Sequence, residues 1–250
     1  MSLFCLVHGA YLGAWCWERL IPELEARGHQ AITMDLPIDD PSSSLSNYAD
    51  VVIQSLQGID NDVILVGHSM AGMIIPIVAT QRPIHQLVFL GGLIPQIGMN
   101  GLAQFYDEVD PDMLEEIDYK PPEKSLFEQI IDEPDLYNPA ALTSKQVSQD
   151  EALAMELCFH DCEPDVAQWA ISKLRDMRSL AHLTEVTPLQ SLPDVEYTYI
   201  VGKDDRIISP TWSKYAARKR LGVEAIEIPG GHYPHISHPI QLAEVLTKNI

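Results

Sequence analysis

The sequence predicts an α/β protein with a doubly wound, mostly parallel β-sheet. Short apolar runs alternate with helical stretches along most of the chain, which is the pattern of repeated strand–helix units. The runs are apolar throughout rather than at every second residue, as expected for parallel strands buried on both faces. At 250 residues, the chain is long enough for one large domain with its own core.

Six runs rich in Val, Ile and Leu are expected to form the sheet. They are Leu3–Val7, Gln30–Asp35, Val63–Val66, Gln86–Leu90, Glu196–Val201 and Glu224–Ile228. Helices are expected at Ala14–Arg27, Ser46–Leu56, Ser69–Gln81, Pro210–Leu221 and Pro239–Ile250. Gly28 is a favourable helix stop, and Pro239 suits the first turn of a helix.

One long stretch interrupts the strand–helix rhythm. Residues 96–193 contain no convincing strand but carry many acidic residues, prolines and helical segments such as Ser148–Leu157 and Pro164–Met177. Because strands resume after this stretch, we expect a single domain over residues 1–250, with a core of 1–95 and 194–250 and an inserted helical cap.

The charge balance narrows the classes of partner. Sixteen Lys and Arg against 36 Asp and Glu give a net charge of −20, which disfavours binding to nucleic acid or to anionic membrane surfaces. No apolar run is long enough for a membrane helix, and the N-terminus lacks the basic region of a signal peptide. We therefore expect a cytoplasmic protein with a small-molecule substrate. The sequence leaves open whether the protein is a monomer or a homodimer.

The strongest chemical motif surrounds Ser69. The segment Val63–Gly72 runs from a strand into a serine flanked by small residues and then directly into a helix, which is typical of a nucleophile elbow. Ala71 stands where the usual pattern has Gly, and Gly72 follows it. The alternative is a serine that only caps a helix.

The acid and base expected to activate this serine follow later in the chain. A strand ends at Gly202, and Asp204 and Asp205 lie in the turn after it. Asp205 is favoured because it directly precedes the run Arg206–Pro210 with which the chain continues, while Asp204 remains the alternative. His232 follows another strand and a Gly pair, so the order Ser, acid, His fits this type of site.

Two backbone amides are expected to form the oxyanion hole. One belongs to Met70, directly after the serine, and the other to Ala10, in the loop after the first strand. In this scheme Asp205 orients His232, His232 deprotonates Ser69, and water resolves the acyl-enzyme. We expect His68 to pack near the turn, since it lies too close in sequence to act as the base.

Neither a metal nor another cofactor is expected. Cys5, Cys16, Cys158 and Cys162 fit no common zinc spacing and are expected to be reduced thiols. His232, His235 and His238 have a regular spacing, but Pro234 disfavours a regular helix across them and no carboxylate or Cys accompanies them. His235 and His238 are therefore expected to be surface or packing residues.

These segments resemble the α/β-hydrolase superfamily across essentially the whole chain, and within it the plant methylesterase and hydroxynitrile lyase group with its bacterial relatives. The segments that carry the resemblance are Leu6–Ala10, Gly13–Trp17, Val66–Met70, Phe159–Cys162 and Glu224–Pro239. The second and fourth are the more specific ones. The resemblance implies an α/β-hydrolase fold and a serine hydrolase.

Two positions distinguish the chemistries of that group. The lyases resemble the esterases but have a Thr in the first oxyanion loop and a Lys directly after the catalytic His, where this chain has Ala10 and Tyr233. Tyr233 cannot supply the cation that stabilises departing cyanide. The resemblance therefore implies an esterase, although a hydroxynitrile lyase, a C–C bond hydrolase and a non-enzymatic ligand receptor on the same scaffold remain alternatives.

The substrate pocket is expected between Ser69 and the cap. Its candidate lining residues are mostly aromatic or apolar, which suits a small, mostly hydrophobic carboxylic ester. They are Tyr11, Leu12, Phe105, Phe159, His160, Trp169, Trp212 and Tyr233. For each of them the alternative is packing in the core.

Overall fold

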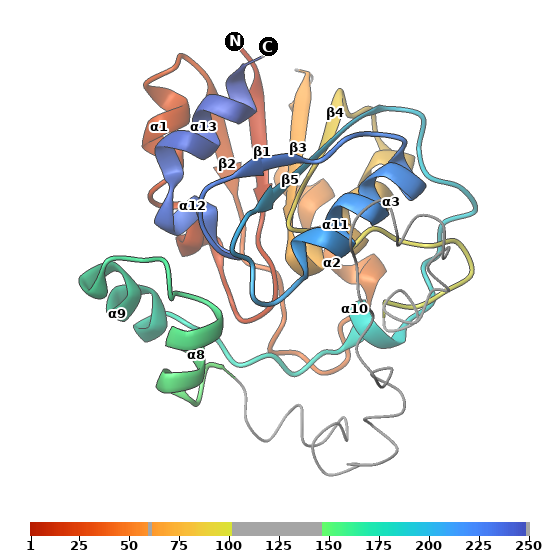
Figure 1. Cartoon of the computed structure of the whole chain (residues 1–250). Helices are drawn as coiled ribbons and strands as arrows, with labels where there is room; N and C mark the ends of the chain where they lie inside the picture. The colour runs from red at the N-terminus through yellow and green to blue at the C-terminus, as the bar shows by residue number, and fades with distance from the viewer. Residues whose placement is uncertain (60–61, 102–146, 249–250) are drawn as a thin grey trace.

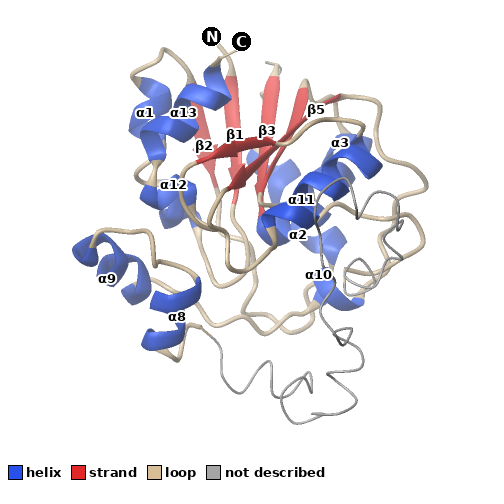
Figure 2. Ribbon diagram, viewed as in Figure 1, coloured by secondary structure: helices blue, strands red, loops and turns tan. Residues whose placement is uncertain are grey.

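The six expected strands form one sheet in a computed structural model that describes residues 1–59, 62–101 and 147–248. Every adjacent pair is parallel, and the order is β2-β1-β3-β4-β5-β6, which confirms the predicted doubly wound sheet. Figure 2 shows this sheet in red between two sets of helices. The strands are β1 Leu3–Val7, β2 Gln30–Thr33, β3 Val63–His68, β4 Gln86–Leu90, β5 Glu196–Gly202 and β6 Ile226–Ile228.

The two faces of the sheet are buried under different helices. Along β1, Leu3, Cys5 and Val7 belong to the core cluster on one face, and Phe4 and Leu6 to the cluster on the other. This alternation explains why the strands are apolar throughout, since successive side chains point to opposite faces.

One face packs against α2, α3 and α11, and the other against α1, α12 and α13 (Figure 1). The bounds of these helices are α1 Ile21–Glu25, α2 Leu45–Ser55, α3 Ile75–Gln81, α11 Pro210–Ala216, α12 Pro234–Ser237 and α13 Pro239–Thr247. None of the helices in the described part of the chain is long and apolar enough to cross a membrane.

Three expected helices are interrupted. The first consists of a 3₁₀ turn at Ala14–Trp17 followed by α1, and the third of a 3₁₀ turn at Ser69–Met73 followed by α3. In both, a proline occupies the first turn of the following helix, where its missing N–H is tolerated. The helix after β5 changes from α11 to a π-helical turn at Ala217–Leu221 and ends at Gly222, whose φ is +69°.

A proline also explains the one-turn helix α12. Pro234 starts this helix, which spans only four residues, as a proline in the first turn allows. His232 precedes the turn and His238 ends it, so the three histidines do not share one regular helix.

Among the described residues between β4 and β5, three further helices occur, namely α8 Glu151–Leu157, α9 Pro164–Ser172 and α10 Ala181–Thr184. Figure 1 shows them beyond the carboxyl ends of the strands, with α8 and α9 beside one another. Ala154 of α8 and Ala167 of α9 join the core cluster on the α1 side of the sheet. This part of the chain therefore lies at the end of the sheet where ligands bind in open α/β folds.

Candidate active site

The strand order changes direction at β1, and the expected nucleophile lies at that point. β2 lies on one side of β1 and β3 on the other, so the loops after β1 and β3 diverge at the carboxyl end of the sheet. Gly9 and Ser69 meet there. A Cβ atom added to Gly9 would lie 2.9 Å from Cβ of Ser69 and 2.7 Å from Nδ1 of His68, so only glycine allows this approach.

Ser69 has the strained backbone of a nucleophile elbow. Its φ is +52°, a left-handed value that non-glycine residues rarely adopt. The residues around it must be small because the turn is tight. A Cβ atom on Gly72 would lie 2.0 Å from the carbonyl oxygen of Leu93, and one on Gly67 would lie 2.8 Å from the side chain of Ile75.

Asp205 and His232 form a buried pair. Nδ1 of His232 lies 2.7 Å from Oδ2 of Asp205, and the exposed fractions of their side chains are 1% and 0%. The other carboxylate oxygen of Asp205 accepts hydrogen bonds from the amides of Ile207 and Ile208 at 2.8 and 2.9 Å. Because the carboxylate accepts, Nδ1 of His232 carries the proton, and Nε2 is left as the basic nitrogen.

Asp204, the alternative acid, lies elsewhere in the same turn. Its side chain is exposed, while its backbone amide donates to the carbonyl of Gly230 at 3.0 Å. The turn thus presents Asp205, and not Asp204, to His232.

His68 links the elbow to the His232 loop. Its Nε2–H donates to the backbone carbonyl of His232 at 2.9 Å, and the two imidazole rings lie 4.8 Å apart between centroids. Burial is the main cause that lowers the pKa of His68 well below its ordinary value, so the ring is neutral at physiological pH. As expected, it packs at the turn.

The two groups expected to exchange a proton both lack a hydrogen-bond partner in the described part of the chain. Within the described residues, neither the Ser69 hydroxyl nor Nε2 of His232 makes a hydrogen bond. Catalytic hydrogen bonds are often formed only when substrate is present, so both groups are available for it.

The amides of Met70 and Ala10 were expected to be the oxyanion donors. Met70 is in the first turn of the 3₁₀ segment Ser69–Met73, where amides lack partners within the helix. The amide of Ala10 has no acceptor within the described part of the chain. The same loop is held by His8, whose Nε2 accepts from the amide of Leu36 at 2.9 Å and whose Nδ1–H therefore donates to the carbonyl of Gly9 at 2.8 Å.

Of the expected lining residues, Tyr233 contacts the ring of His232, and Phe159 packs on Tyr233. The ring of Tyr233 is 5.1 Å from that of His232 and 5.1 Å from that of Phe159, between centroids. Burial raises the pKa of Tyr233 well above its ordinary value, with the neighbouring Cys158 thiol as the next cause. Its phenol is therefore neutral. Tyr11, whose φ is +62°, is half-buried in the loop after β1.

The other expected lining residues have different surroundings. Leu12 is fully buried in the core, and Nε2 of His160 approaches Gly231, where an added Cβ would lie 2.8 Å away. Trp169 packs edge-on against Trp15 with Lys173 above its ring, and Trp212 is buried beside the guanidinium of Arg220. Phe105 lies outside the described residues.

Asp161 contacts the His232 loop, which sequence reasoning did not anticipate. Its Oδ2 accepts the amide of Gly231 at 2.7 Å and lies 3.6 Å from Nδ1 of His238. The Phe-His-Asp-Cys segment was noted only as a mark of resemblance, and no local signal indicated a partner 70 residues away.

His235 is also more deeply placed than a surface residue. It is fully buried, and its ring lies 4.4 Å from that of Trp17 and 4.6 Å from that of His68, between centroids. The packing alternative for His235 is therefore the one that fits its position. His238 is half-buried.

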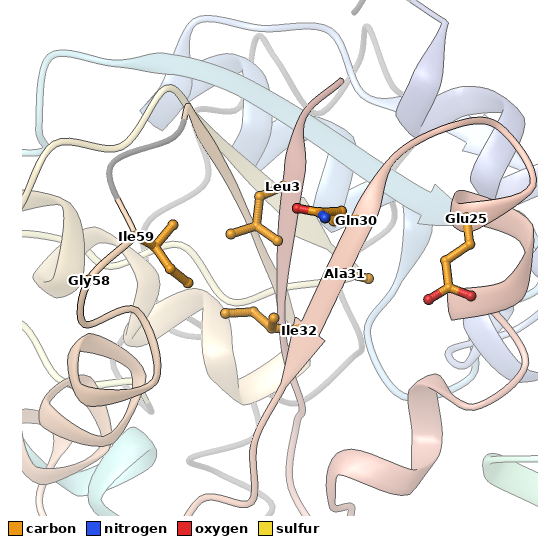
Figure 3. Close-up of a pocket in the computed structure, with 7 residues that line it drawn as sticks. All are labelled: Leu3, Glu25, Gln30, Ala31, Ile32, Gly58 and Ile59. Atoms are coloured by element: carbon orange, nitrogen blue, oxygen red, sulfur yellow. The ribbon is translucent and has the colours of Figure 1, made fainter.

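A hollow of about 430 Å³ lies far from this site (Figure 3). Leu3, Gln30 and Ile59, which line it, stand at or just before the beginnings of β1, β2 and β3. It therefore belongs to the amino end of the sheet, opposite the end that carries Ser69 and His232. Among the described residues, no group of three or more His, Cys, Asp or Glu side chains is arranged to hold a metal ion.

The chain is similar to known proteins over most of its length. Residues 6–245 match the profile of the alpha/beta hydrolase family. Salicylic acid-binding protein 2 of Nicotiana tabacum is 26% identical over 98% of this chain and 95% of its own length. Methylesterase 8 of Arabidopsis thaliana is 40% identical over a shorter part, 37% of this chain and 38% of that protein. These relatives confirm the predicted resemblance to plant methylesterases.

The crystal structure of polyneuridine aldehyde esterase has a similar fold. Its TM-score is 0.74 at 20% sequence identity, and the match covers 99% of this chain and 98% of that one. A likeness at this identity shows the fold, and it confirms the expected α/β-hydrolase fold.

Proposed function

Because the chain belongs to the alpha/beta hydrolase family, we propose that it is a serine hydrolase that cleaves small, mostly hydrophobic carboxylic esters. One observation carries this proposal: Ser69 stands on a strained turn with φ of +52°, and the hydrogen-bonded Asp205–His232 pair is anchored to the same turn through His68. Such a strained backbone costs free energy, and strain of this kind is found mainly at functional sites.

In the first half of the reaction, Oγ of Ser69 attacks the ester carbonyl carbon while Nε2 of His232 takes the hydroxyl proton. The amides of Ala10 and Met70 stabilise the negative charge on the tetrahedral intermediate. The intermediate collapses when the carbon–oxygen bond to the alcohol breaks, and the alcohol leaves with the proton held by His232.

In the second half, water attacks the acyl-enzyme. His232 accepts a proton from this water and returns it to Oγ of Ser69 as the acid product leaves. The carboxylate of Asp205 stabilises the imidazolium that forms in each half. No cofactor takes part in this scheme.

Residues 96–193 act in this proposal as a helical cap on the core formed by 1–95 and 194–250. Two contacts support a cap that reaches the site. The carboxylate of Asp161 accepts the amide of Gly231, and the ring of Phe159 packs on that of Tyr233. A cap in this position would surround the acyl group with apolar side chains and exclude water.

The names of the relatives suggest the leaving group. Several of them are methylesterases, which supports methyl esters of small apolar acids as the first substrates to examine. The acidity of the chain, with a net charge of −20, also favours neutral substrates over anionic ones.

Tyr233 argues against a hydroxynitrile lyase. A lyase needs a cation beside the histidine, whereas the Tyr233 phenol is neutral and only 3% exposed. Cyanide release from mandelonitrile should therefore be at the background rate.

The test is the hydrolysis of a short-chain p-nitrophenyl ester by the wild type, Ser69→Ala and Ser42→Ala. Ser42 is an exposed loop residue and serves as the matched control. We expect steady turnover by the wild type and Ser42→Ala, and a loss of about 10⁵-fold or more in kcat for Ser69→Ala. Absence of turnover by the folded wild type, or activity retained by Ser69→Ala, would refute the proposal.

A further inference from the structure

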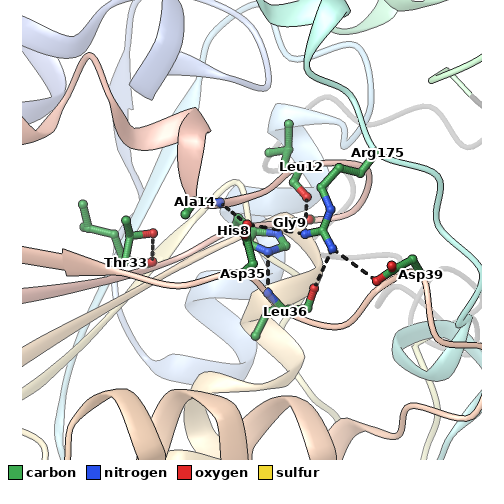
Figure 4. Close-up of polar contacts among 10 residues, drawn as sticks. His8, Gly9, Leu12, Ala14, Thr33, Asp35, Leu36, Asp39 and Arg175 are labelled. Carbon is green, nitrogen blue, oxygen red and sulfur yellow. Dashed lines mark hydrogen bonds and ion pairs between the residues drawn. The ribbon is translucent and has the colours of Figure 1, made fainter.

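Arg175 joins the loop after β1, which carries the candidate oxyanion donor Ala10, to the loop after β2. Its backbone amide donates to the carbonyl of Tyr11 at 2.8 Å, and Nη1 donates to the carbonyl of Leu12 at 3.3 Å. Nη2 donates to the carbonyl of Leu36 at 3.2 Å, in the loop after β2. Figure 4 shows the guanidinium between these two loops.

The loop it contacts has an unusual shape that needs support. Tyr11 has φ of +62°, and together with Ser69 it makes up the left-handed non-glycine residues of the described chain. Such a conformation persists only where neighbouring contacts fix it. Ala10, whose amide is the candidate donor, directly precedes Tyr11. The direction of this amide therefore depends on how the strained turn is held.

The same guanidinium acts on the loop a second time through Asp35. Nη1 of Arg175 lies 3.5 Å from Oδ1 of Asp35, and that oxygen accepts the amide of Ala14 at 2.7 Å. A Cβ atom on Gly13 would lie only 2.6 Å from the same oxygen, so the loop passes closely over it. Nη2 also pairs with Asp39 at 3.2 Å.

We propose that Arg175 is a positioning residue that fixes the direction of the Ala10 amide by clamping the oxyanion loop to the loop after β2. This inference rests on the proposed serine hydrolase activity. It also gives the segment after α9 a role in transition-state stabilisation, beyond covering the site.

The contacts distinguish Arg175 from an ordinary surface arginine. Asp35 and Asp39 are 65% and 67% exposed, so their ion pairs alone would contribute little. The two carbonyl acceptors are different, because both bonds are partly buried and charge-assisted. The planar fork holds donors in fixed, separated directions toward acceptors on both loops, which the compact ammonium group of Lys does not reproduce.

The test compares Arg175→Met with Arg178→Met. Both variants remove one positive charge from the same segment, but the Arg178 side chain is exposed, while its backbone amide bonds Ile38. We expect Arg175→Met to lower kcat for p-nitrophenyl acetate by about 10- to 100-fold with little change in KM, since the donor is needed mainly in the transition state. Arg178→Met should match the wild type in both constants.

A second readout follows the oxyanion itself. An alkyl trifluoromethyl ketone forms a tetrahedral adduct with the serine, and its affinity should fall in Arg175→Met by the same factor as kcat/KM. A folded Arg175→Met with wild-type kcat and wild-type inhibitor affinity would overturn the proposal. So would an equal loss in both Met variants.

Arg175→Lys keeps the proposal testable if Arg175→Met fails to fold. This variant retains the charge and most of the stem, and we expect a kcat several-fold below that of the wild type. Full wild-type kcat in Arg175→Lys would show that charge near the loop is sufficient, which contradicts the clamp.

Hydrogen exchange separates failure of the clamp from failure of the proposed function. The amides of Ala14 and Leu36 should exchange at least about 10-fold faster in Arg175→Met than in the wild type. Their exchange rates in Arg178→Met should equal those of the wild type. If the two amides exchange faster in Arg175→Met but the wild type has no esterase activity, the clamp stands and the hydrolase proposal is refuted. Unchanged exchange, with esterase activity present in the wild type, would refute the clamp alone.

Discussion

Nδ1 of His232 lies 2.7 Å from Oδ2 of Asp205, and this carboxylate is held in turn by two backbone amides. The pair is buried, so its geometry is fixed before any substrate arrives. It assigns the proton on the imidazole to Nδ1 and leaves Nε2 to accept a proton from Ser69.

Replacing Asp205 should therefore remove more activity than replacing its neighbour. In Asp205→Asn the side-chain amide can donate to Nδ1 and favour the wrong tautomer of His232, which is expected to lower kcat by about 10⁴-fold. Asp204→Asn, an exposed control in the same turn, should retain nearly full kcat. Steady-state kinetics with a p-nitrophenyl ester measures both, and comparable losses in the two variants would contradict the assignment.

The tightness of the elbow gives a prediction about stability. A methyl group at residue 72 would meet the Leu93 carbonyl oxygen at 2.0 Å, so Gly72→Ala should lower the free energy of unfolding by about 3 kcal/mol or more. Gly58→Ala is the control, because Gly58 has φ of +73° but nothing within 4 Å. It should lose only about 1 kcal/mol from the left-handed backbone. Urea unfolding of both variants would show whether the close contact matters more than the backbone angle.

The fold could be predicted because its signals are local. Each strand is a short apolar run, and residues such as Phe4 and Cys5 point into opposite core clusters, so the runs lack polar residues. Helix interruptions were less predictable. Pro22 and Pro76 each fall where a new helix begins after a 3₁₀ turn, and a sequence pattern alone does not distinguish this from a continuous helix.

The candidate site was predictable only where it follows strand ends. Ser69, Asp205 and His232 each come directly after a strand or its turn, which is why their order and position indicated a site. Asp161 and Arg175 lie in the long stretch between β4 and β5, and their partners Gly231 and Leu36 are remote in sequence. No periodicity or spacing marks such contacts.

Asp161 is expected to position the loop that carries His232. Its carboxylate accepts the Gly231 amide at 2.7 Å, so Asp161→Ala should displace His232 and lower kcat by about 10-fold or more. Asp161→Asn still offers an acceptor oxygen and should recover most of the activity. Kinetics of the two variants beside Asp165→Ala, an exposed acid at the start of α9, tests this. Equal activity of Asp161→Ala and Asp165→Ala would argue against the role.

Buried histidines predict a loss of stability in mild acid. Burial lowers the pKa of His182 to about 4 in the folded protein, whereas an unfolded histidine has a pKa of about 6.5. Between these two values the unfolded chain binds more protons, so the free energy of unfolding falls as the pH falls from 6.5 towards 4. His8, with a folded pKa of about 4 for the same reason, acts in the same direction.

The contribution of His182 can be isolated by substitution. Between pH 7 and pH 5 the wild type should lose on the order of 2 kcal/mol more than His182→Gln, because the variant has no imidazole to protonate. His85→Gln removes an exposed histidine and should show the wild-type pH dependence. The free energy of unfolding is measured by denaturant titration at each pH. If it depends on pH in the same way for all three proteins, burial of neutral His182 does not account for the acid sensitivity.

The measurement that most directly tests the central claim is covalent labelling with a fluorophosphonate, followed by peptide mapping. A phosphonylated serine cannot be hydrolysed readily, so the label records which hydroxyl is activated by a base. We predict one phosphonyl group per chain, on Ser69, with esterase activity falling in proportion to labelling and no label in Ser69→Ala. Label on another residue, or full activity in a completely labelled protein, would contradict the assignment of Ser69 as the nucleophile.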